Sequence, residues 1–185
     1  MNKHDKILTE KNCALLVVDI QERILPAMYE NERFLENSLK LIKGLKVLQI
    51  PIFFTEQYPK GLGGTVKVIK DELEGLTAFE KMTFSCIGPE NLLAELQKNN
   101  IKKIILIGIE AHVCVLQTAL DLIANKFEVF LPADAVTSRK KQDCEVALKR
   151  MEKHGVEITL TESVLFELLN VCGTDQFKQI SKIVK

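Results

Sequence analysis

Cys114 is the first candidate for chemistry, because it stands where a helix should begin. An apolar run ends at Ile107, Gly108 follows, and an apolar helical pattern starts at about Cys114. Free backbone N–H groups and the dipole at a helix start favour an anion, and the thiolate is the nucleophilic form of cysteine. The same N–H groups can hold the oxyanion of a tetrahedral intermediate. The position predicts a nucleophile, with a buried structural cysteine as the alternative.

Asp19 and Lys81 are the acid–base groups that a cysteine nucleophile needs. Asp19 ends an apolar run, where a carboxylate is costly unless it is paired or functional, and it can accept a thiol proton and later activate water. Lys81 stands among large apolar residues, and a cation there lowers the pKa of a nearby thiol and keeps a carboxylate ionised. The alternatives are a turn-capping role for Asp19 and an exposed edge position for Lys81.

The pattern of apolar residues indicates which elements position these side chains. Short apolar runs, typical of strands buried on both faces, alternate with stretches in which apolar residues recur near a 3.6-residue period. The expected strands are residues 13–18, 51–55, 103–107, 128–131 and 156–160, and the expected helices are residues 31–48, 90–99, 114–126 and 140–154. Residues 56–75 are expected to form a long loop with a short helix near 66–73, and residues 161–185 two short helices.

This alternation predicts an α/β fold, a three-layer α/β/α sandwich around a mainly parallel sheet, in one domain spanning residues 1–185. Ligands of open parallel sheets bind beyond the carboxyl ends of the strands, near the point where the strand order reverses. Asp19 and Cys114 both stand just after strands, and Lys81 lies between them in the chain. We therefore expect the three side chains to converge at this edge of the sheet.

Composition and charge disfavour several classes of protein. Of the 185 residues, 46% are hydrophobic and 27% charged, as in ordinary globular chains and unlike disordered or fibrous ones. Lys plus Arg and Asp plus Glu both number 25, so no surplus cation is available for nucleic-acid binding, and a nuclease is disfavoured. No apolar run approaches the roughly 20 residues that span a bilayer, and no signal-peptide core precedes the first strand. These features predict a cytoplasmic protein that binds neither membrane nor nucleic acid.

The cysteines do not form a recognisable disulfide or metal pattern. Their number is odd, their spacing is wide and no Cys-x-x-Cys occurs; they are Cys13, Cys86, Cys114, Cys144 and Cys172. A secreted disulfide framework and a thiolate zinc site are both disfavoured. Most of these thiols are expected to be small buried apolar groups in a reducing compartment.

Three segments resemble the isochorismatase-like cysteine hydrolases. They are residues 15–21 (LLVVDIQ), the segment around Lys81, and residues 108–115 (GIEAHVCV), and the resemblance runs from about residue 14 to 168, leaving a helical C-terminal tail. Residues 55–63 (TEQYPKGLG), 112–121 (HVCVLQTALD) and 133–139 (ADAVTSR) are similar to the isochorismatase-domain-containing branch of that superfamily.

The resemblance implies a Rossmann-like, six-stranded parallel sheet with Asp19, Lys81 and Cys114 as the catalytic triad. It also implies a cis peptide between Ile109 and Glu110, with the backbone N–H groups of Glu110 and Cys114 forming the oxyanion hole. Cys114 would attack an amide-like carbonyl, the leaving group would take a proton delivered through Asp19, and water would hydrolyse the thioester. Members of this superfamily commonly assemble, so a homo-oligomer, a dimer or larger, is expected.

Two departures refine what the resemblance implies. Nicotinamidases of the superfamily carry an Asp/His metal cluster shortly after the second strand, whereas residues 56–61 (EQYPKG) contain no histidine. We therefore expect no metal and no cofactor. Isochorismate is cleaved at a vinyl ether, for which a covalent thiolate is unnecessary, so Cys114 favours a small C–N substrate. A vinyl-ether hydrolase and a catalytically idle binding or scaffold protein remain the alternatives.

Gln21, Tyr58 and Phe84 are further candidates for lining a substrate pocket. The glycine-rich residues 61–64 lack the spacing of a phosphate-binding loop, and a loop at the pocket rim or an oligomer contact is favoured instead. His112 lies two residues before Cys114, but neighbours in a tight turn usually point apart, so we favour a surface or capping role. The apolar residues 164–171 are a candidate surface for packing on a partner.

Overall fold

Strand β1 (Cys13–Val18) lies near the middle of a parallel sheet, and all six of its residues are buried. The computed structural model describes residues 4, 7–88 and 91–185. Its strands follow the order β3-β2-β1-β4-β5-β7, and the two-residue β6 pairs with β4 beside this path. The other strands are β2 (Ile52–Gln57), β3 (Phe79–Lys81), β4 (Lys103–Ile109), β5 (Glu128–Pro132), β6 (Val136–Thr137) and β7 (Glu157–Thr159).

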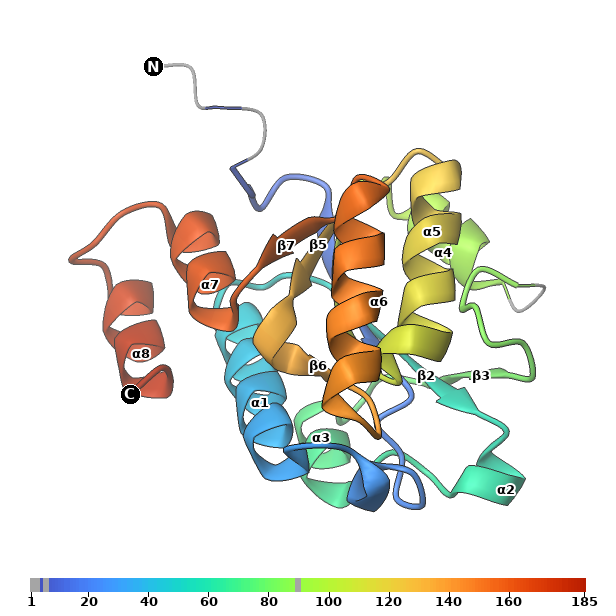
Figure 1. Ribbon diagram of the computed structural model, residues 1–185. Helices are drawn as coiled ribbons and strands as arrows, with labels where there is room; N and C mark the ends of the chain where they lie inside the picture. Colours follow the sequence, from blue (N-terminus) through green and yellow to red (C-terminus); the bar gives the residue numbers. More distant parts are fainter. Residues whose placement is uncertain (1–3, 5–6, 89–90) are drawn as a thin grey trace.

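Helices cover both faces of this sheet, which gives the predicted three-layer α/β/α arrangement (Figure 1). One layer holds α1 (Asn31–Val47), α3 (Lys67–Glu72), α7 (Thr161–Leu169) and α8 (Asp175–Ile183). The other layer holds α4 (Leu92–Lys98), α5 (Leu116–Ala124) and α6 (Lys141–Lys153). Shorter helical turns are Leu25–Ala27, α2 (Pro59–Leu62), the π-helical Ala111–Val115 and Ala133–Ala135.

Alternation along the central strands divides the buried apolar side chains into two cores. In β1, Leu15 and Val17 pack with α1 and α7, whereas Leu16 and Val18 pack on the side of α5 and α6. Successive side chains of a strand point to opposite faces, so a strand buried on both faces must be apolar throughout. This requirement explains why the central strands of the sheet appear as unbroken apolar runs in the sequence.

The structure differs from the sequence expectations at the polar ends of the strands. Strand β2 continues to Gln57, two residues beyond the predicted end, and the edge strand β3 was not predicted as a strand. The helix expected from residue 114 is a π-helical turn, Ala111–Val115, followed by α5. With β6 included, the sheet has seven strands instead of six.

The C-terminal helices pack on the same chain. In α7, Val164, Leu165, Leu168 and Leu169 are all buried, and they belong to the core that α1 and α8 also line. These four residues are therefore not a free apolar face, and the expectation that residues 164–171 pack on a partner was wrong for them, whereas Phe166 is 36% exposed. Val171, beyond the helix, is exposed.

Candidate active site

The carboxyl ends of four neighbouring strands meet at the candidate site. The chain runs outward from β1 through β2 to β3 and then returns to place β4 on the other side of β1. The strand order therefore reverses between β1 and β4, and open parallel sheets bind ligands at such a point. Asp19 directly follows β1, Lys81 ends β3, and Cys114 lies in the π-helical turn after β4.

Asp19 and Lys81 form an ion pair inside the protein. Lys81 Nζ lies 2.7 Å from Asp19 Oδ2, and the two side chains are only 2% and 0% exposed. The other carboxylate oxygen, Oδ1, accepts a 2.7 Å hydrogen bond from Thr55 Oγ1. A buried charge needs a partner of this kind, since an unpaired one is strongly destabilising. The exposed edge position considered for Lys81 was wrong.

Lys81 has more acceptors than it has protons to donate. Besides Asp19, its Nζ contacts Gln57 Oε1 at 2.8 Å, Phe84 O at 3.0 Å and Thr83 O at 3.2 Å. Burial alone lowers the pKa of the Lys81 ammonium, whereas the acidic groups of Cys86, Asp19 and Cys114 together raise it by more. The net pKa lies above its ordinary value of 10.5, so Lys81 is a fixed positive charge at neutral pH.

The Cys114 thiol lies beside this pair and is almost buried, with 7% of the residue exposed. Its Sγ is 3.9 Å from Gln57 Oε1, with the thiol as the donor. Burial and the negative charge of Asp19 raise the pKa of Cys114 to about 12, and Lys81 only partly opposes them. This direction favours the thiol over the thiolate at neutral pH, against the expectation that a helix start and a lysine would hold the sulfur ionised.

Sequence reasoning missed Gln57, because the polar pair at residues 56–57 was assigned to a loop. Gln57 is paired on nearly every side: its backbone N–H donates to Gln21 Oε1 at 2.8 Å and its backbone oxygen accepts from Gln21 Nε2 at 3.0 Å. Its own Nε2 donates to Met82 O at 3.0 Å. Gln21 also donates to Gly63 O and is fully buried, so it ties β2 and the residues after α2 to the residues that follow β1.

A second thiol, Cys86, lies next to Thr55, which donates to the Asp19 carboxylate. Its Sγ is 3.6 Å from Thr55 Oγ1, and its backbone N–H donates to Thr118 Oγ1 at 2.9 Å. Thr55 has a single hydroxyl proton, which it donates to Asp19, so the Cys86 thiol is the donor toward Thr55. Burial raises the pKa of Cys86 to about 11, and this thiol is therefore protonated as well.

The turn after β4 brings Cys114 back toward β1. A Cβ on Gly108 would lie 2.1 Å from Val18 O, and its φ of +127° is one that residues with side chains rarely adopt. A cis peptide joins Ile109 to Glu110, at the position that the resemblance implied. The Glu110 carboxylate turns outward, where Oε2 accepts from Arg139 Nε at 2.9 Å.

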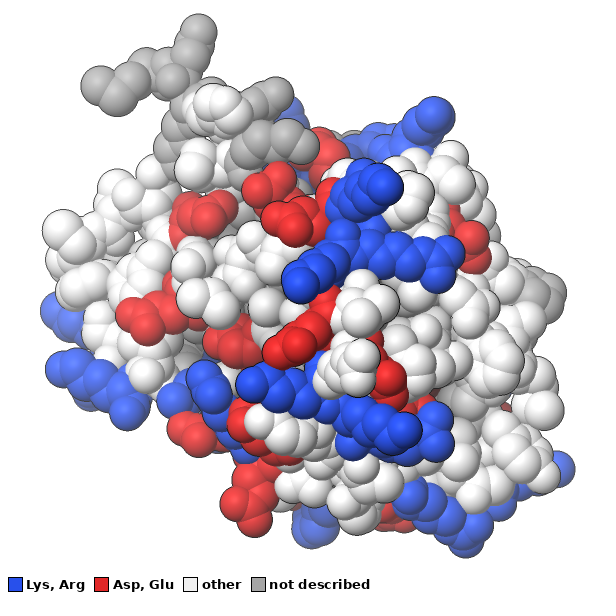
Figure 2. Space-filling view, viewed as in Figure 1, with Lys and Arg blue, Asp and Glu red and all other residues white. Residues whose placement is uncertain are grey.

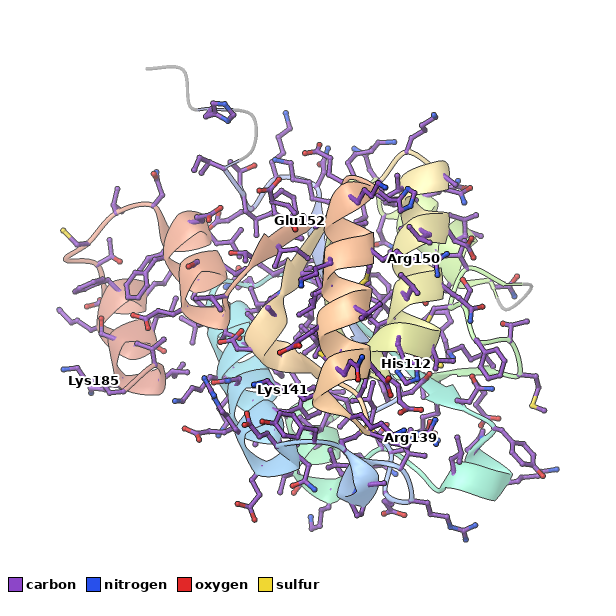
Figure 3. All side chains as sticks on the ribbon, viewed as in Figure 1. His112, Arg139, Lys141, Arg150, Glu152 and Lys185 are labelled. Carbon is purple, nitrogen blue, oxygen red and sulfur yellow. The ribbon has the colours of Figure 1, made fainter. Side chains whose placement is uncertain are left out.

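His112 is not a partner of the Cys114 thiol. Its Nδ1 lies 2.9 Å from Ser138 Oγ, on the segment that follows β6. Figure 3 shows His112, Arg139 and Lys141 at one end of the molecule, beside the start of α6, with Arg150 and Glu152 toward the other end of that helix. The favoured non-catalytic role of His112 agrees with this placement.

Exposed aromatic and apolar side chains surround the buried polar centre. Tyr58, Met82 and Phe84, which follow β2 and β3, have exposed fractions of 47%, 69% and 54%. The Tyr58 ring packs on Gly61, where even a Cβ would not fit. Of the three residues expected to line a pocket, Tyr58 and Phe84 are thus exposed, whereas Gln21 is buried.

Neither a metal cluster nor a membrane span is found in the part of the chain that the structure describes. Across residues 4, 7–88 and 91–185, no three His, Cys, Asp or Glu side chains are grouped to hold a metal ion. No helix within these ranges combines the length and the hydropathy needed to cross a bilayer. On the face seen in Figure 2, Lys and Arg are interspersed with Asp and Glu instead of forming a field of one sign.

Comparison with known proteins places this geometry in a family. The Isochorismatase domain model matches residues 13–163. Isochorismatase domain-containing protein 1 of Salmo salar is 39% identical over 167 residues, which are 90% of this chain and 59% of the salmon protein. The chain thus spans about three-fifths of the length of that relative.

Two solved structures share the fold over almost the whole chain. MAR1 ribonuclease from Caenorhabditis elegans is 37% identical, with a TM-score of 0.89, over 96% of this chain and 91% of that one. The YcaC gene product of Escherichia coli, an octameric hydrolase of unknown specificity, is 22% identical, with a TM-score of 0.90, over 98% and 92%. The family and the α/β fold predicted from the sequence are confirmed.

Proposed function

Because the chain belongs to the isochorismatase-like hydrolase family, we propose that it is a metal-independent cysteine hydrolase that cleaves a small amide-like C–N bond. The observation that carries the proposal is the meeting of three side chains from separate strand ends. A buried carboxylate–ammonium pair lies beside a thiol in a part of the chain where buried charge would otherwise only reduce stability.

Asp19 acts as the base in the first step. The thiol proton of Cys114 moves to the Asp19 carboxylate as sulfur attacks the substrate carbonyl, and the C=O electron pair moves onto oxygen. A thiol with a pKa near 12 is a poor nucleophile until a base removes its proton, so the reaction needs this carboxylate. The N–H groups of Glu110 and Cys114 are proposed to hold the oxyanion.

The remaining steps return every group to its starting state. The tetrahedral intermediate collapses, the C–N bond breaks, and the leaving nitrogen takes the proton from Asp19. A water molecule then gives a proton to Asp19 and attacks the thioester, which releases the acid. The proton returns from Asp19 to Cys114 sulfur, so that one amide and one water become one acid and one amine.

Lys81 keeps the Asp19 carboxylate ionised, as the first step requires. The ammonium charge stabilises the ionised Asp19 before proton transfer and the sulfur as negative charge develops on it. Tyr58 and Phe84 are proposed to contact the apolar part of the substrate at the rim. The site requires no cofactor in this proposal.

The proposal is tested by screening small amides for hydrolysis with the wild type, Cys114→Ala and Cys114→Ser. Wild-type turnover that both variants lose, with an unchanged melting temperature, supports a cysteine hydrolase. Turnover of a vinyl ether alone favours the isochorismate-type alternative. Failure to bind or turn over any member of the panel favours the idle binding fold.

RNA hydrolysis is the second candidate, because the C. elegans protein of 37% identity is described as a ribonuclease. The chain has no net charge, which disfavours extended phosphate contacts. Incubation of labelled RNA with the wild type and Cys114→Ala, with and without a chelator, separates the two candidates. RNA cleavage that tracks the purified wild type and disappears in Cys114→Ala would replace the amide proposal.

We also propose that the protein is a cytoplasmic homo-oligomer. All five cysteines are free, in keeping with a reducing compartment. The octameric YcaC product shares the fold, and the exposed Tyr58, Met82 and Phe84 are apolar surface of the kind that subunits bury. Light scattering on a sizing column gives the number of subunits, and a monomer at micromolar concentration would refute the oligomer.

A further inference from the structure

Gln57 is the side chain that joins the Lys81 ammonium to the Cys114 thiol. Its Oε1 lies 2.8 Å from Lys81 Nζ and 3.9 Å from Cys114 Sγ. The residue is nearly buried, and it ends strand β2 at the register position opposite Lys81. Neither the strand pattern nor the triad resemblance assigns it a part in the site.

The orientation of the Gln57 amide is fixed by its neighbours. An ammonium group can only donate, so the amide atom that faces Lys81 must be the oxygen. The amide nitrogen then donates to Met82 O at 3.0 Å, and both backbone groups of Gln57 are bound to Gln21. A rotated amide would lose the hydrogen bonds to Lys81, Cys114 and Met82 and would place its N–H groups against a cation.

We propose that Gln57 is a positioning residue that holds the Cys114 thiol protonated beside the acid–base pair. This role of the thiol rests on the proposed function, whereas the contact itself does not. A carbonyl oxygen accepts the S–H proton and carries partial negative charge, so it stabilises the thiol and opposes a thiolate. It also competes with sulfur for the positive charge of Lys81.

In this arrangement the thiolate forms only when a substrate is bound and Asp19 takes the thiol proton. Burial and the Asp19 charge already favour the thiol, as its raised pKa indicates, and Gln57 adds a directed acceptor. General alkylating reagents, which need a thiolate but do not recruit Asp19, should therefore react slowly with Cys114. Changes at Gln57 should alter that reactivity in a direction set by charge.

Two substitutions separate positioning from simple packing. Gln57→Met fills similar space without an acceptor, and Gln57→Glu keeps the acceptor and adds a negative charge. The measurement is the rate of Cys114 alkylation by iodoacetamide at about pH 9, followed by peptide mass spectrometry. We expect roughly a tenfold rise for Gln57→Met and a fall of about tenfold for Gln57→Glu, each equivalent to about one pKa unit.

Two other cysteines of the same protein serve as controls for the activity of the reagent and for folding. Exposed Cys172 should react equally in all variants, and buried Cys13 should stay protected unless a variant unfolds. Gln176→Met and Gln176→Glu, on the exposed surface of α8, are the matched pair that should leave Cys114 unchanged. Shifts in the same direction for both Gln57 variants, or no shift in either, would overturn the proposal.

A measurement on the unaltered Gln57 covers the case in which the variants unfold. The infrared S–H stretching band of Cys114 is obtained at neutral pH as the difference between the wild type and Cys114→Ala. We expect a band moved to lower frequency by hydrogen bonding, and the absence of a Cys114 S–H band would refute a protonated, held thiol. Neither readout depends on turnover, so a protein inactive on every amide could still satisfy this inference, and an active one could fail it.

Discussion

Lys81 Nζ lies 2.7 Å from Asp19 Oδ2 although both side chains are shielded from solvent. The two residues are 62 positions apart in the chain, and they meet because β1 and β3 flank β2 in one parallel sheet. Lys81 belongs to a short edge strand, yet the residues that follow β3 cover it and accept from its ammonium group. The proposed chemistry uses this ion pair, and because the pair is buried, the stability of the fold should depend on it as well.

The effects of removing the two charges of the pair on stability should not be additive, because removal of either one leaves the other buried without a counter-ion. Lys81→Met leaves the Asp19 carboxylate buried without a counter-ion and should lower the free energy of unfolding by roughly 3–5 kcal/mol. In the double variant Asp19→Asn with Lys81→Met, the free energy of unfolding should fall by clearly less than the sum of the losses in the two single variants. Urea denaturation of all three variants and the wild type measures this coupling.

An exposed pair is the control for that comparison. Lys67 Nζ and Asp71 Oδ2 are 2.8 Å apart on the surface of α3, so the distance is similar and only the burial differs. Lys67→Met should leave the denaturation midpoint almost unchanged, because solvent screens exposed pairs. Equal effects of Lys67→Met and Lys81→Met would contradict the importance of burial.

The five thiols should be alkylated in the order of their exposure and pKa. Cys172 is exposed and should react first, whereas buried Cys114, with a pKa near 12, should be slow at neutral pH. The rate at Cys114 should rise about tenfold for each pH unit, since its thiolate fraction does so below the pKa. Peptide mass spectrometry after timed labelling gives the order, and fast labelling of Cys114 at pH 7 would show that its thiol is activated at rest.

Alkaline pH should destabilise the protein through its buried thiols. Burial raises the pKa of Cys13 from 9.0 to about 12 in the folded chain. A raised folded pKa means that the stabilisation is complete below about pH 9 and is lost as pH rises toward 12, because the unfolded thiol ionises first. When the pH is raised from about 8 to 10.5, the free energy of unfolding should therefore fall by about 2 kcal/mol less in Cys13→Ala than in the wild type.

The readout for Cys13 is the difference in stability between the two pH values, not the stability at either one. Cys13→Ala creates a cavity and lowers the free energy of unfolding at both values. Guanidinium denaturation of the wild type and the variant at each pH gives the free energies of unfolding from which the change with pH is calculated for each protein. An identical pH dependence in the wild type and the variant would show that ionisation of Cys13 does not contribute.

Gly108 should be irreplaceable because of the backbone next to it. A Cβ there would lie 2.1 Å from Val18 O, so Gly108→Ala should cost at least about 3 kcal/mol or prevent folding. Gly75 is the control, since it also has a positive φ, +84°, but nothing within 4 Å of its Cβ position. Gly75→Ala should cost only about 1 kcal/mol, the usual penalty of that conformation. Thermal unfolding compares the two, and similar losses would contradict the close approach.

The fold was largely readable from the sequence because central parallel strands must be apolar on both faces. The β1 and β4 runs are unmistakable for this reason, and Asp19, Lys81 and Cys114 were all singled out from their positions next to strands or among apolar residues. Edge strand β3 has one neighbouring strand and only three residues, so the sequence contains no apolar run that would predict it.

The sequence could not reveal which polar groups, far apart in the chain, form hydrogen bonds with one another. Gln57 resembles a loop residue, and only the positions of Gln21, Met82 and Lys81 show that each of its polar atoms has a partner. For the same reason the sequence pointed to an ionised Cys114, since local helix geometry on its own favours a thiolate. Burial and the charge of Asp19, which are tertiary features, decide the outcome.

The most direct measurement is intact-protein mass spectrometry of the wild type mixed rapidly with members of a small-amide panel. A substrate should add the mass of its acyl part, without the leaving amine, to the peptide that contains Cys114. The adduct should be absent from Cys114→Ala and should disappear as free acid forms. Hydrolysis of an amide at an undiminished rate by Cys114→Ala, or an acyl adduct confined to another cysteine, would contradict the proposed nucleophile.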